Sequence, residues 1–264
     1  MGKKIPKEIY EKAMNMMIEE NKSGNQVAKE LGLNAQNMLQ NIKKHFDWSP
    51  LKDGKKSVDS DYFETIDTEE KAYWLGFLTA DGYISTKSNS IELALKESDY
   101  DHIKKFQQAI KSKHKIGKRH IKNSIAYRIN IKDKKMAKDI ADKSFINKKS
   151  FDAFIYKELE SHLIRHYIRG LIEGDGYISK DGKTIELTSA SKCLVQDFLV
   201  IIKKEFNYDC KIKKRSDSKA VSVRILNSAI SYKVLDWLYK DASIYLDRKY
   251  SIYNCRLNST LQKN

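Results

Sequence analysis

The sequence is poor in the residues that build disulfide frameworks, zinc ribbons and loop-rich folds. It contains only two prolines and three cysteines in 264 residues, and the cysteines, Cys193, Cys210 and Cys255, form no CxxC pair. An odd number of dispersed cysteines excludes a disulfide framework and a zinc ribbon, and it is typical of a protein from a reducing compartment.

Long apolar runs are also missing. The longest is "FLVII" at 198–202, far below the roughly 18 apolar residues that indicate a membrane-spanning helix. The start "MGKKIP" lacks the apolar core of a signal peptide. These absences predict a cytoplasmic, nucleoid-associated protein with no membrane partner.

Acidic residues are too few to balance the basic ones. Fifty lysines and arginines stand against 35 aspartates and glutamates, which leaves a formal net charge of +15. Such an excess is typical of proteins that bind nucleic acid. Hydrophobic residues make up 41% of the chain and aromatic residues 10%, so the sequence predicts a folded protein with a substantial core and not a disordered basic tail.

The first part of the chain, residues 1–46, predicts three short helices, and the polar segment 47–60 predicts a linker. Ala28 and Gly32 are spaced as in a helix-turn-helix, where small residues let two helices cross closely. An ordinary three-helix cap is the alternative interpretation. In the DNA-binding interpretation, the last helix offers polar side chains to base edges: Gln36, Asn37 and Gln40.

From residue 61 onward the chain repeats itself. "WLGFLTADGYIS" at 74–85 matches "IRGLIEGDGYIS" at 168–179, and the hydrophobic patterns that follow keep the same order in both copies. The pattern predicts an α+β fold made of two α-β-β-α-β-β-α repeats, over 61–158 and 159–264. Each copy begins with a helix that ends at an aspartate, Asp81 or Asp175, followed by a glycine expected to act as a C′ cap.

These two aspartates are unusual because a carboxylate at the negative end of a helix dipole is disfavoured by roughly 0.3–1 kcal/mol. Both helices also carry small residues four positions apart, Gly76 and Ala80 in the first copy and Gly170 and Gly174 in the second. We expect the helices to pack along these small residues. Asp81 and Asp175 would then meet and, with the carbonyls of Ala80 and Gly174, form an oxygen-lined site for Mg²⁺, or for Mn²⁺ as a substitute.

Both segments resemble the nine-residue motif of the LAGLIDADG homing endonucleases, in the single-chain form with two motifs. The metal-binding acid at the eighth motif position falls on Asp81 and Asp175, whereas the sixth position differs between the copies, with Thr79 and Glu173. The resemblance covers about residues 61–253. It implies two sheets forming a saddle over double-stranded DNA, and a monomer of bacterial or phage origin that cleaves both strands of a long specific target.

The resemblance also assigns roles to polar residues on the strands. Lys132, at the end of the fourth strand of the first copy, is expected to be catalytic with Asp81 and Asp175, whereas the second copy has Leu226 at that place. Glu92 and Glu186 fall among the same polar residues, with acceptance from cytosine amino groups as one interpretation. The expected DNA-binding residues of the sheets are Lys96, Lys118, Arg119, Arg128, Asn130, Lys132, Lys211, Lys213, Arg215 and Arg224.

The sequence therefore predicts a Mg²⁺-dependent, site-specific double-strand DNA endonuclease. One alternative is a non-catalytic transcription regulator, because bacterial regulators join the same double fold to a helix-turn-helix, although they tend to lose the acids. The other alternative is an intron RNA maturase, which can retain them. His162 and His166 lie four residues apart but lack the HExxH glutamate and a third ligand, so they predict a polar helix face and not a zinc site.

Overall fold

The computed structural model describes residues 5–20, 22–48, 57–121, 124–146, 149–214 and 219–261. The chain divides into two compact units, Met1–Lys56 and Ser57–Asn264. Within the described residues, no helix is long and apolar enough to cross a membrane.

The first unit consists of α1 (Lys7–Glu19), α2 (Gly24–Glu30) and α3 (Ala35–Phe46). Ser23 begins α2 with a capping box that it shares with Gln26, and the Asn34 side chain accepts a hydrogen bond from the Asn37 backbone at the start of α3. Between these helices Gly32 has a φ of +64°, a conformation that favours glycine. The core of the unit consists of Tyr10, Ala13, Met17, Val27, Ala28, Met38 and Ile42.

The second unit contains two copies of the predicted α-β-β-α-β-β-α order, which confirms the α+β fold. The first copy has α4 (Glu69–Asp81), β1 (Tyr83–Ser85), β2 (Ser90–Lys96), α5 (Tyr100–Ala109), β3 (Gly117–Ile121), β4 (Ser124–Lys132) and α6 (Lys134–Ser144). The second has α8 (Ile164–Asp175), β5 (Gly176–Ile178), β6 (Ile185–Ser189), α9 (Lys192–Phe206), β7 (Ile212–Lys214), β8 (Val221–Ile225) and α10 (Ser228–Tyr239). Two helices follow the copies, the short α7 (Lys149–Asp152) and α11 (Asp247–Leu261).

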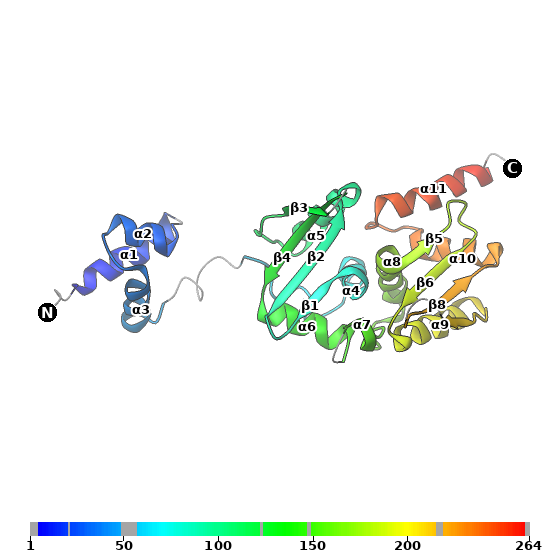
Figure 1. The fold of residues 1–264 in the computed structure, drawn as a ribbon, viewed down its shortest axis with the longest axis horizontal. Helices are drawn as coiled ribbons and strands as arrows, with labels where there is room; N and C mark the ends of the chain where they lie inside the picture. The colour runs from blue at the N-terminus through cyan, green and yellow to red at the C-terminus, as the bar shows by residue number, and fades with distance from the viewer. Residues whose placement is uncertain are drawn as a thin grey trace. The chain divides into compact units, whose positions relative to one another are not determined.

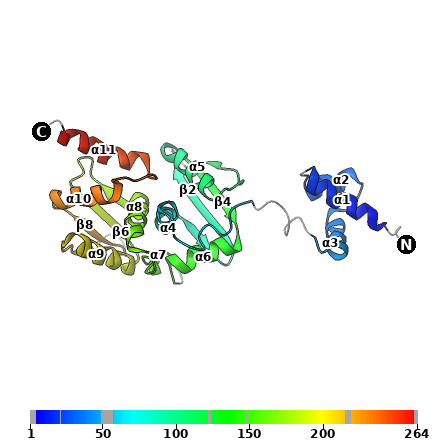
Figure 2. The same cartoon turned by 180° about the vertical axis from the view of Figure 1, so that it is seen from behind.

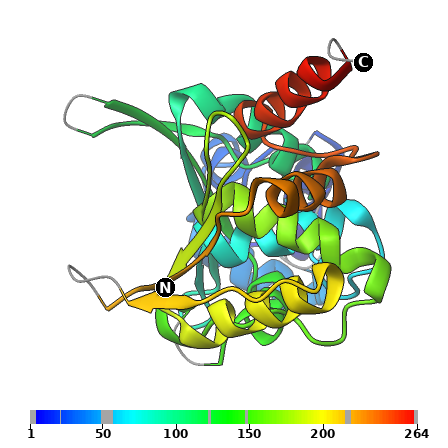
Figure 3. The ribbon, with the colours of Figure 1, turned by 90° about the vertical axis from the view of Figure 1, so that its right-hand side faces the viewer.

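Each copy forms one four-stranded antiparallel sheet, in the order β1-β2-β4-β3 and β5-β6-β8-β7. The registers correspond, since Glu92 lies opposite Asn130 in the first sheet and Glu186 opposite Arg224 in the second. Alternate strand residues are buried under the helices. Figure 3 shows the strands of both sheets on one side of the unit and the helices on the other. One face of each sheet, called here the outer face, is therefore left without helices.

Helices α4 and α8 lie side by side between the two sheets, as both the front and the rear views show (Figures 1 and 2). Every residue of α4 from Ala72 to Ala80 is buried. A helix that is buried on all sides lies at the centre of a core, and one hydrophobic cluster runs through both repeats. The two sheets are thus joined through the pair of helices that carry Asp81 and Asp175.

Candidate metal centre and nucleic-acid interface

The two central helices touch backbone to backbone. A Cβ atom added to Gly76 would lie 2.1 Å from the Tyr167 carbonyl oxygen, and one added to Gly170 would lie 2.1 Å from the Tyr73 carbonyl oxygen. No side chain tolerates such contacts, so this crossing requires glycine at both positions. A Cβ added to Gly174 would lie 2.4 Å from the Cβ of Ala80. The structure therefore brings together the four small residues that the sequence predicts at the interface.

Asp81 and Asp175 are the last residues of α4 and α8. Gly174 lies close to the Asp81 side chain, since a Cβ added to Gly174 would be 3.5 Å from the Asp81 Cγ. The glycines that follow the aspartates do not act as the left-handed caps expected from the sequence, because Gly82 (φ −71°) and Gly176 (φ −84°) are extended. They are needed for space, as a Cβ on either would lie 2.6 Å from a carbonyl oxygen of its own helix.

The environment of the two aspartates disfavours their negative charge. Burial raises the pKa of Asp81 to about 6, and the negative charge of the neighbouring Asp175 carboxylate contributes to this rise. Burial also raises the pKa of Asp175. Because both residues keep solvent-accessible surface, their desolvation is partial. A bound cation would remove this repulsion, which is the electrostatic property expected of a metal site.

Two lysines that the sequence analysis missed occupy the ends of the same helices. Lys149 in α7 donates from Nζ to the carbonyl oxygens of Leu78 (3.2 Å), Thr79 (3.0 Å) and Ala80. These ammonium contacts satisfy the last carbonyls of α4 and offset the negative end of its dipole. Burial lowers the pKa of Lys149 to about 8, although Asp175 and Asp81 act in the opposite direction.

Lys249 in α11 does the same for α8. Its Nζ donates to the carbonyl oxygens of Ile172 (2.6 Å), Glu173 (2.9 Å) and Gly176 (2.6 Å). Burial and the nearby Arg248 lower the pKa of Lys249 to about 8. The segments "KKSF" at 148–151 and "RKYS" at 248–251 each place a second basic residue before this lysine. That repeated pair marks the two lysines as equivalent, but it does not show that they reach the helix ends.

Lys132 does not lie beside the acids, contrary to the sequence prediction. It pairs with Ser90 at the end of β4, and its Nζ donates to the Ser88 carbonyl oxygen at 3.4 Å. Ser90 in turn lies opposite Ser85, the last residue of β1. Because β1 leads away from Asp81, a residue next to its far end is remote from the carboxylate. The cations that act on the Asp81 carboxylate are Lys149, Lys249 and Arg248.

Ala80 is also a poorer metal ligand than the sequence suggests. Its carbonyl oxygen accepts a hydrogen bond from the Lys149 ammonium, and a cation already at that oxygen opposes the approach of a second one. The three carbonyls that Lys249 reaches do not include Gly174, so the equivalent carbonyl of α8 is not engaged in this way.

Family comparisons match both repeats. A family model described as "LAGLIDADG-like domain" matches residues 162–236, and one described as "WhiA LAGLIDADG-like domain" matches residues 70–142. Each match includes one of the two helices that end in the paired aspartates. The chain belongs to the LAGLIDADG family. It has the single-chain form with two motifs, and none of the curated proteins compared with it shows significant sequence similarity.

Solved structures share the LAGLIDADG fold at low sequence identity. The meganuclease I-SmaMI bound to uncleaveable DNA has a TM-score of 0.51 and 13% identity, with 73% of this chain and 91% of that chain covered. The homing endonuclease I-WcaI bound to its DNA recognition sequence has a TM-score of 0.48 and 17% identity, over 73% and 90%. Full-length DUF199/WhiA from Thermatoga maritima has a TM-score of 0.47 and 14% identity. The match covers 76% of this chain and 65% of that protein.

The sixth LAGLIDADG position lies in the interface between α4 and α8 and makes its hydrogen bonds there. Glu173 is fully buried, and its Oε2 accepts hydrogen bonds from the Tyr73 hydroxyl (2.5 Å) and the Leu246 backbone nitrogen (2.7 Å). The equivalent hydroxyl in the other helix, that of Tyr167, donates to Thr79 Oγ1 at 3.0 Å. Burial raises the pKa of Glu173 to about 7.

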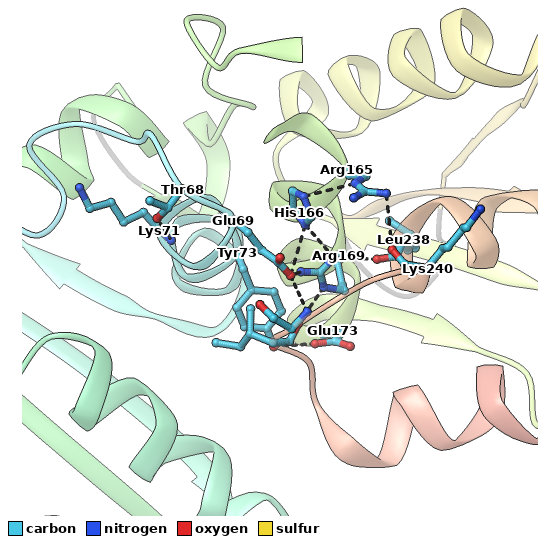
Figure 4. Close-up of polar contacts among 12 residues, drawn as sticks. Thr68, Glu69, Lys71, Tyr73, Arg165, His166, Arg169, Glu173, Leu238 and Lys240 are labelled. Carbon is cyan, nitrogen blue, oxygen red and sulfur yellow. Dashed lines mark hydrogen bonds and ion pairs between the residues drawn. The ribbon is translucent and has the colours of Figure 1, made fainter. Parts of the chain in front are cut away.

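A buried arginine on α8, Arg169, links α4 by hydrogen bonds to the end of α10 and the segment that follows it (Figure 4). Arg169 donates to Glu69 Oε1 at 2.7 Å, to the Ile244 carbonyl oxygen at 2.9 Å and to the Leu238 carbonyl oxygen at 2.7 Å. His166 Nδ1 lies 3.0 Å from the same guanidinium, and burial lowers the pKa of His166 to about 4. His166 is therefore a buried member of this network and, contrary to the sequence prediction, does not lie on an exposed polar face of the helix.

The strand registers decide which predicted DNA-binding residues share the outer face. Direct cross-strand partners lie on the same face, so Lys118, which lies opposite Tyr127, is on the helix-bearing face, with its Nζ 6.0 Å from the Tyr127 ring centroid. Arg215 lies outside the described residues. Lys211 is exposed just before β7, and Gln36, Asn37 and Gln40 are exposed on α3. The outer face carries Lys96, Arg119, Arg128, Asn130 and Lys132 in the first sheet and Lys213 and Arg224 in the second.

Glu92 and Glu186 have partners within their own sheets. Glu92 Oε2 accepts a hydrogen bond from Asn130 Nδ2 at 3.1 Å and forms an ion pair with Arg128 at 3.5 Å. Glu186 forms an ion pair with Arg224 at 2.8 Å. Both glutamates therefore hold polar neighbours in place on the outer face, which is a role that the sequence alone did not reveal.

Proposed function

We propose that this LAGLIDADG protein is a monomeric, divalent-metal-dependent, site-specific DNA endonuclease. The observation that carries the proposal is the pair of carboxylates, Asp81 and Asp175, held side by side at the ends of two helices that cross at glycines. Both metal positions of the motif are acidic, and each helix end also has a lysine that donates to its last carbonyls. A protein that only bound DNA would need neither the pair of acids nor the cations beside them.

The donor set fits a hard divalent cation. Asp81 and Asp175 supply carboxylate oxygens, the ligands that Mg²⁺ prefers and Mn²⁺ accepts. Within the described part of the chain, no third histidine, cysteine, aspartate or glutamate joins them in a metal cluster, so the proposal assigns the remaining ligand positions to DNA phosphate oxygens and water. When bound, the metal would neutralise the scissile phosphates and lower the pKa of the attacking water.

Lys149 and Lys249 would supply the protein's own positive charge at this centre. Their hydrogen bonds to helix-end carbonyls fix each ammonium close to a carboxylate, without a rearrangement when DNA binds. A pKa of about 8 keeps most of each amine protonated at neutral pH. We therefore assign these two lysines the electrostatic role that the sequence assigned to Lys132, and we assign Lys132 to phosphate contact.

The outer face would bind the DNA duplex. Its basic residues belong to a chain of net charge +15, and a cationic surface of this kind attracts the phosphate backbone. The first unit would add a second DNA contact through Gln36, Asn37 and Gln40 on α3, which are exposed together with Lys43 and Lys44.

A DNA-binding regulator without nuclease activity is the second candidate. Two observations favour it: the first repeat matches the WhiA type of LAGLIDADG domain, and a three-helix unit precedes the repeats. The two candidates differ in their need for the acids. Cleavage requires Asp81 and Asp175, whereas sequence-specific binding does not.

The test is a selection of cleavable sites from a plasmid library that carries a randomised duplex segment. The full-length chain with Mg²⁺, and in parallel with Mn²⁺, should cut a subset of library members at one defined position. The Asp81→Asn, Asp175→Asn double variant should bind the selected duplex and leave it intact. If the unsubstituted chain binds a specific duplex but cuts it with neither metal, the regulator is the correct assignment. Cleavage by the double variant would show that the metal site is elsewhere.

A further inference from the structure

Arg224 and Glu186 form the best-defined ion pair on the outer face of the second sheet. They lie directly opposite each other in β8 and β6, with the arginine Nε 2.8 Å from Glu186 Oε2. The Arg224 side chain is 48% exposed, whereas that of Glu186 is only 12% exposed. The carboxylate thus lies within the sheet surface, and the guanidinium extends beyond it.

Glu186 is itself held in place. The Thr188 hydroxyl donates to Glu186 Oε1 at 3.3 Å, so both carboxylate oxygens have a partner. Within the described residues, the Arg224 guanidinium is engaged through Nε alone. Its two terminal nitrogens, Nη1 and Nη2, therefore keep their donors for an external ligand, on a group whose orientation is already restricted.

The first sheet has a different residue at the same place. Asn130 occupies the position opposite Glu92 that Arg224 occupies opposite Glu186. Its Nδ2 donates to Glu92 at 3.1 Å and its Oδ1 accepts from the Ser90 hydroxyl at 3.4 Å. Each end of this amide has one partner inside the sheet, so Asn130 offers DNA only one free N–H. The pseudo-symmetric pair of positions is thus asymmetric in what it offers to DNA.

We propose that Arg224 reads one guanine in the major groove of the half-site under the second sheet, and that Glu186 is its positioning residue. The inference rests on the proposed DNA-binding function of the outer face. Guanine presents two adjacent acceptors, N7 and O6, which match the two terminal nitrogens of an arginine. A phosphate is the poorer ligand here because the buried carboxylate of Glu186 beside the guanidinium repels it. At the equivalent position of the first half-site, Asn130 has no pair of free donors and does not make this guanine contact.

The test compares base preferences without relying on cleavage. The full-length chain selects binding sites from a randomised duplex library in the absence of divalent metal, and the bound sequences are read. One position should show guanine, and Arg224→Ala should reduce the preference at that position alone by about tenfold or more, since a bidentate contact contributes about 1–3 kcal/mol of discrimination. Glu186→Gln should weaken the same preference, because the ion pair that orients the Arg224 guanidinium is lost. Glu92→Gln, the matched change in the other sheet, should leave it unchanged.

Replacing that guanine with 7-deazaguanine separates the contact from indirect effects. The replacement removes N7, so it should weaken binding by the unsubstituted chain and have no effect on Arg224→Ala. If Arg224→Ala instead lowers affinity equally for all sequences and reduces the salt dependence, Arg224 is a phosphate contact and the guanine assignment is wrong, while the DNA-binding function stands. If the unsubstituted chain enriches no sequence, both the guanine contact and the proposed function are wrong.

Discussion

The Tyr73 hydroxyl in α4 donates a 2.5 Å hydrogen bond to Glu173 in α8, and the reciprocal pair, Tyr167 in α8 and Thr79 in α4, is joined at 3.0 Å. The two tyrosines occupy equivalent positions of the repeats, and so do their acceptors. The same geometry is therefore filled by a titratable carboxyl group in one half of the interface and by a neutral hydroxyl in the other. Of these two hydrogen-bonded pairs, the one with Glu173 carries a group that titrates near neutral pH.

Stability should change with pH through Glu173. Its pKa is raised to about 7 in the folded protein from an ordinary value of 4.5, so between these values the folded state binds more protons than the unfolded state. Stability from this group is fully present below pH 4.5 and decreases as the pH rises through 7, by up to about 3 kcal/mol.

The Glu173→Gln variant isolates this contribution. A glutamine oxygen can still accept from Tyr73 and Leu246, and the amide nitrogen would take the place of Glu173 Oε1, close to the Tyr239 hydroxyl. The difference in unfolding free energy between the variant and the unsubstituted chain, from urea titrations at pH 5 and pH 8, should favour the variant at pH 8 and shrink toward pH 5. A difference that is independent of pH would contradict the raised pKa.

Removing one carboxylate of the metal centre should separate binding from cleavage. We expect Asp81→Asn to lower the single-turnover cleavage rate by at least about a hundredfold, since it removes a metal ligand. Affinity for DNA without metal should be unchanged or higher, because the substitution removes a negative charge that faces the duplex. Asp101→Asn, on an exposed acid of α5 paired with Lys104, is the control and should cleave normally.

The lysines at the helix ends should matter for chemistry, and Lys132 should not. Lys149→Met removes a partly buried cation that acts on both acids, and we expect single-turnover cleavage to slow by at least about tenfold. One strand should be affected more than the other, so nicked circles should accumulate, and Lys249→Met should favour the opposite nick.

Lys132→Met is the comparison for those two variants. It should raise Kd and reduce the salt slope, with equal rates on both strands. Gel analysis of supercoiled, nicked and linear plasmid, at saturating enzyme, measures all three variants. A strand-selective loss of rate in Lys132→Met, with normal rates in both helix-end variants, would reverse our assignment.

The crossing of α4 and α8 should tolerate no added methyl group. Gly170→Ala would place a Cβ 2.1 Å from the Tyr73 carbonyl oxygen and 2.7 Å from the Phe77 backbone nitrogen, and backbone atoms cannot give way. We expect a loss of more than about 3 kcal/mol of stability, or failure to fold. Gly117→Ala, whose Cβ would meet only the Arg128 carbonyl oxygen at 3.8 Å, should change stability by less than about 1 kcal/mol. Urea unfolding monitored by circular dichroism measures both.

Local patterns were enough to predict the architecture. The alternation of "YRINIKD" and "VSVRIL" identifies strands, and the duplication of the glycine and aspartate positions identifies the central helices and their contact. These features depend on residues that are close in the sequence, or on comparison of the two repeats. The helix-end aspartates are of this kind, and the structure places them together.

The remaining parts of the site depend on the path of the chain between elements. Lys149 and Lys249 reach the helix ends from segments that follow α6 and α10, and no local pattern states where such a segment returns. Lys118 lies on the helix-bearing face because of the register between β3 and β4, which the alternation within one strand does not fix. The position of Lys132 away from the aspartates has a similar cause, since the pattern along β4 does not show the direction in which β1 leaves Asp81.

The backbone contact between α4 and α8 has a consequence beyond stability. Each helix is fixed to its own sheet by buried side chains, and the two helices meet where Gly76 and Gly170 leave no intervening side chain. The distance between the two carboxylates therefore changes together with the distance between the two sheets. In the proposed complex with DNA, any change that moved the sheets apart to fit a longer duplex would also move Asp81 away from Asp175, so the spacing of the half-sites would be coupled to cleavage.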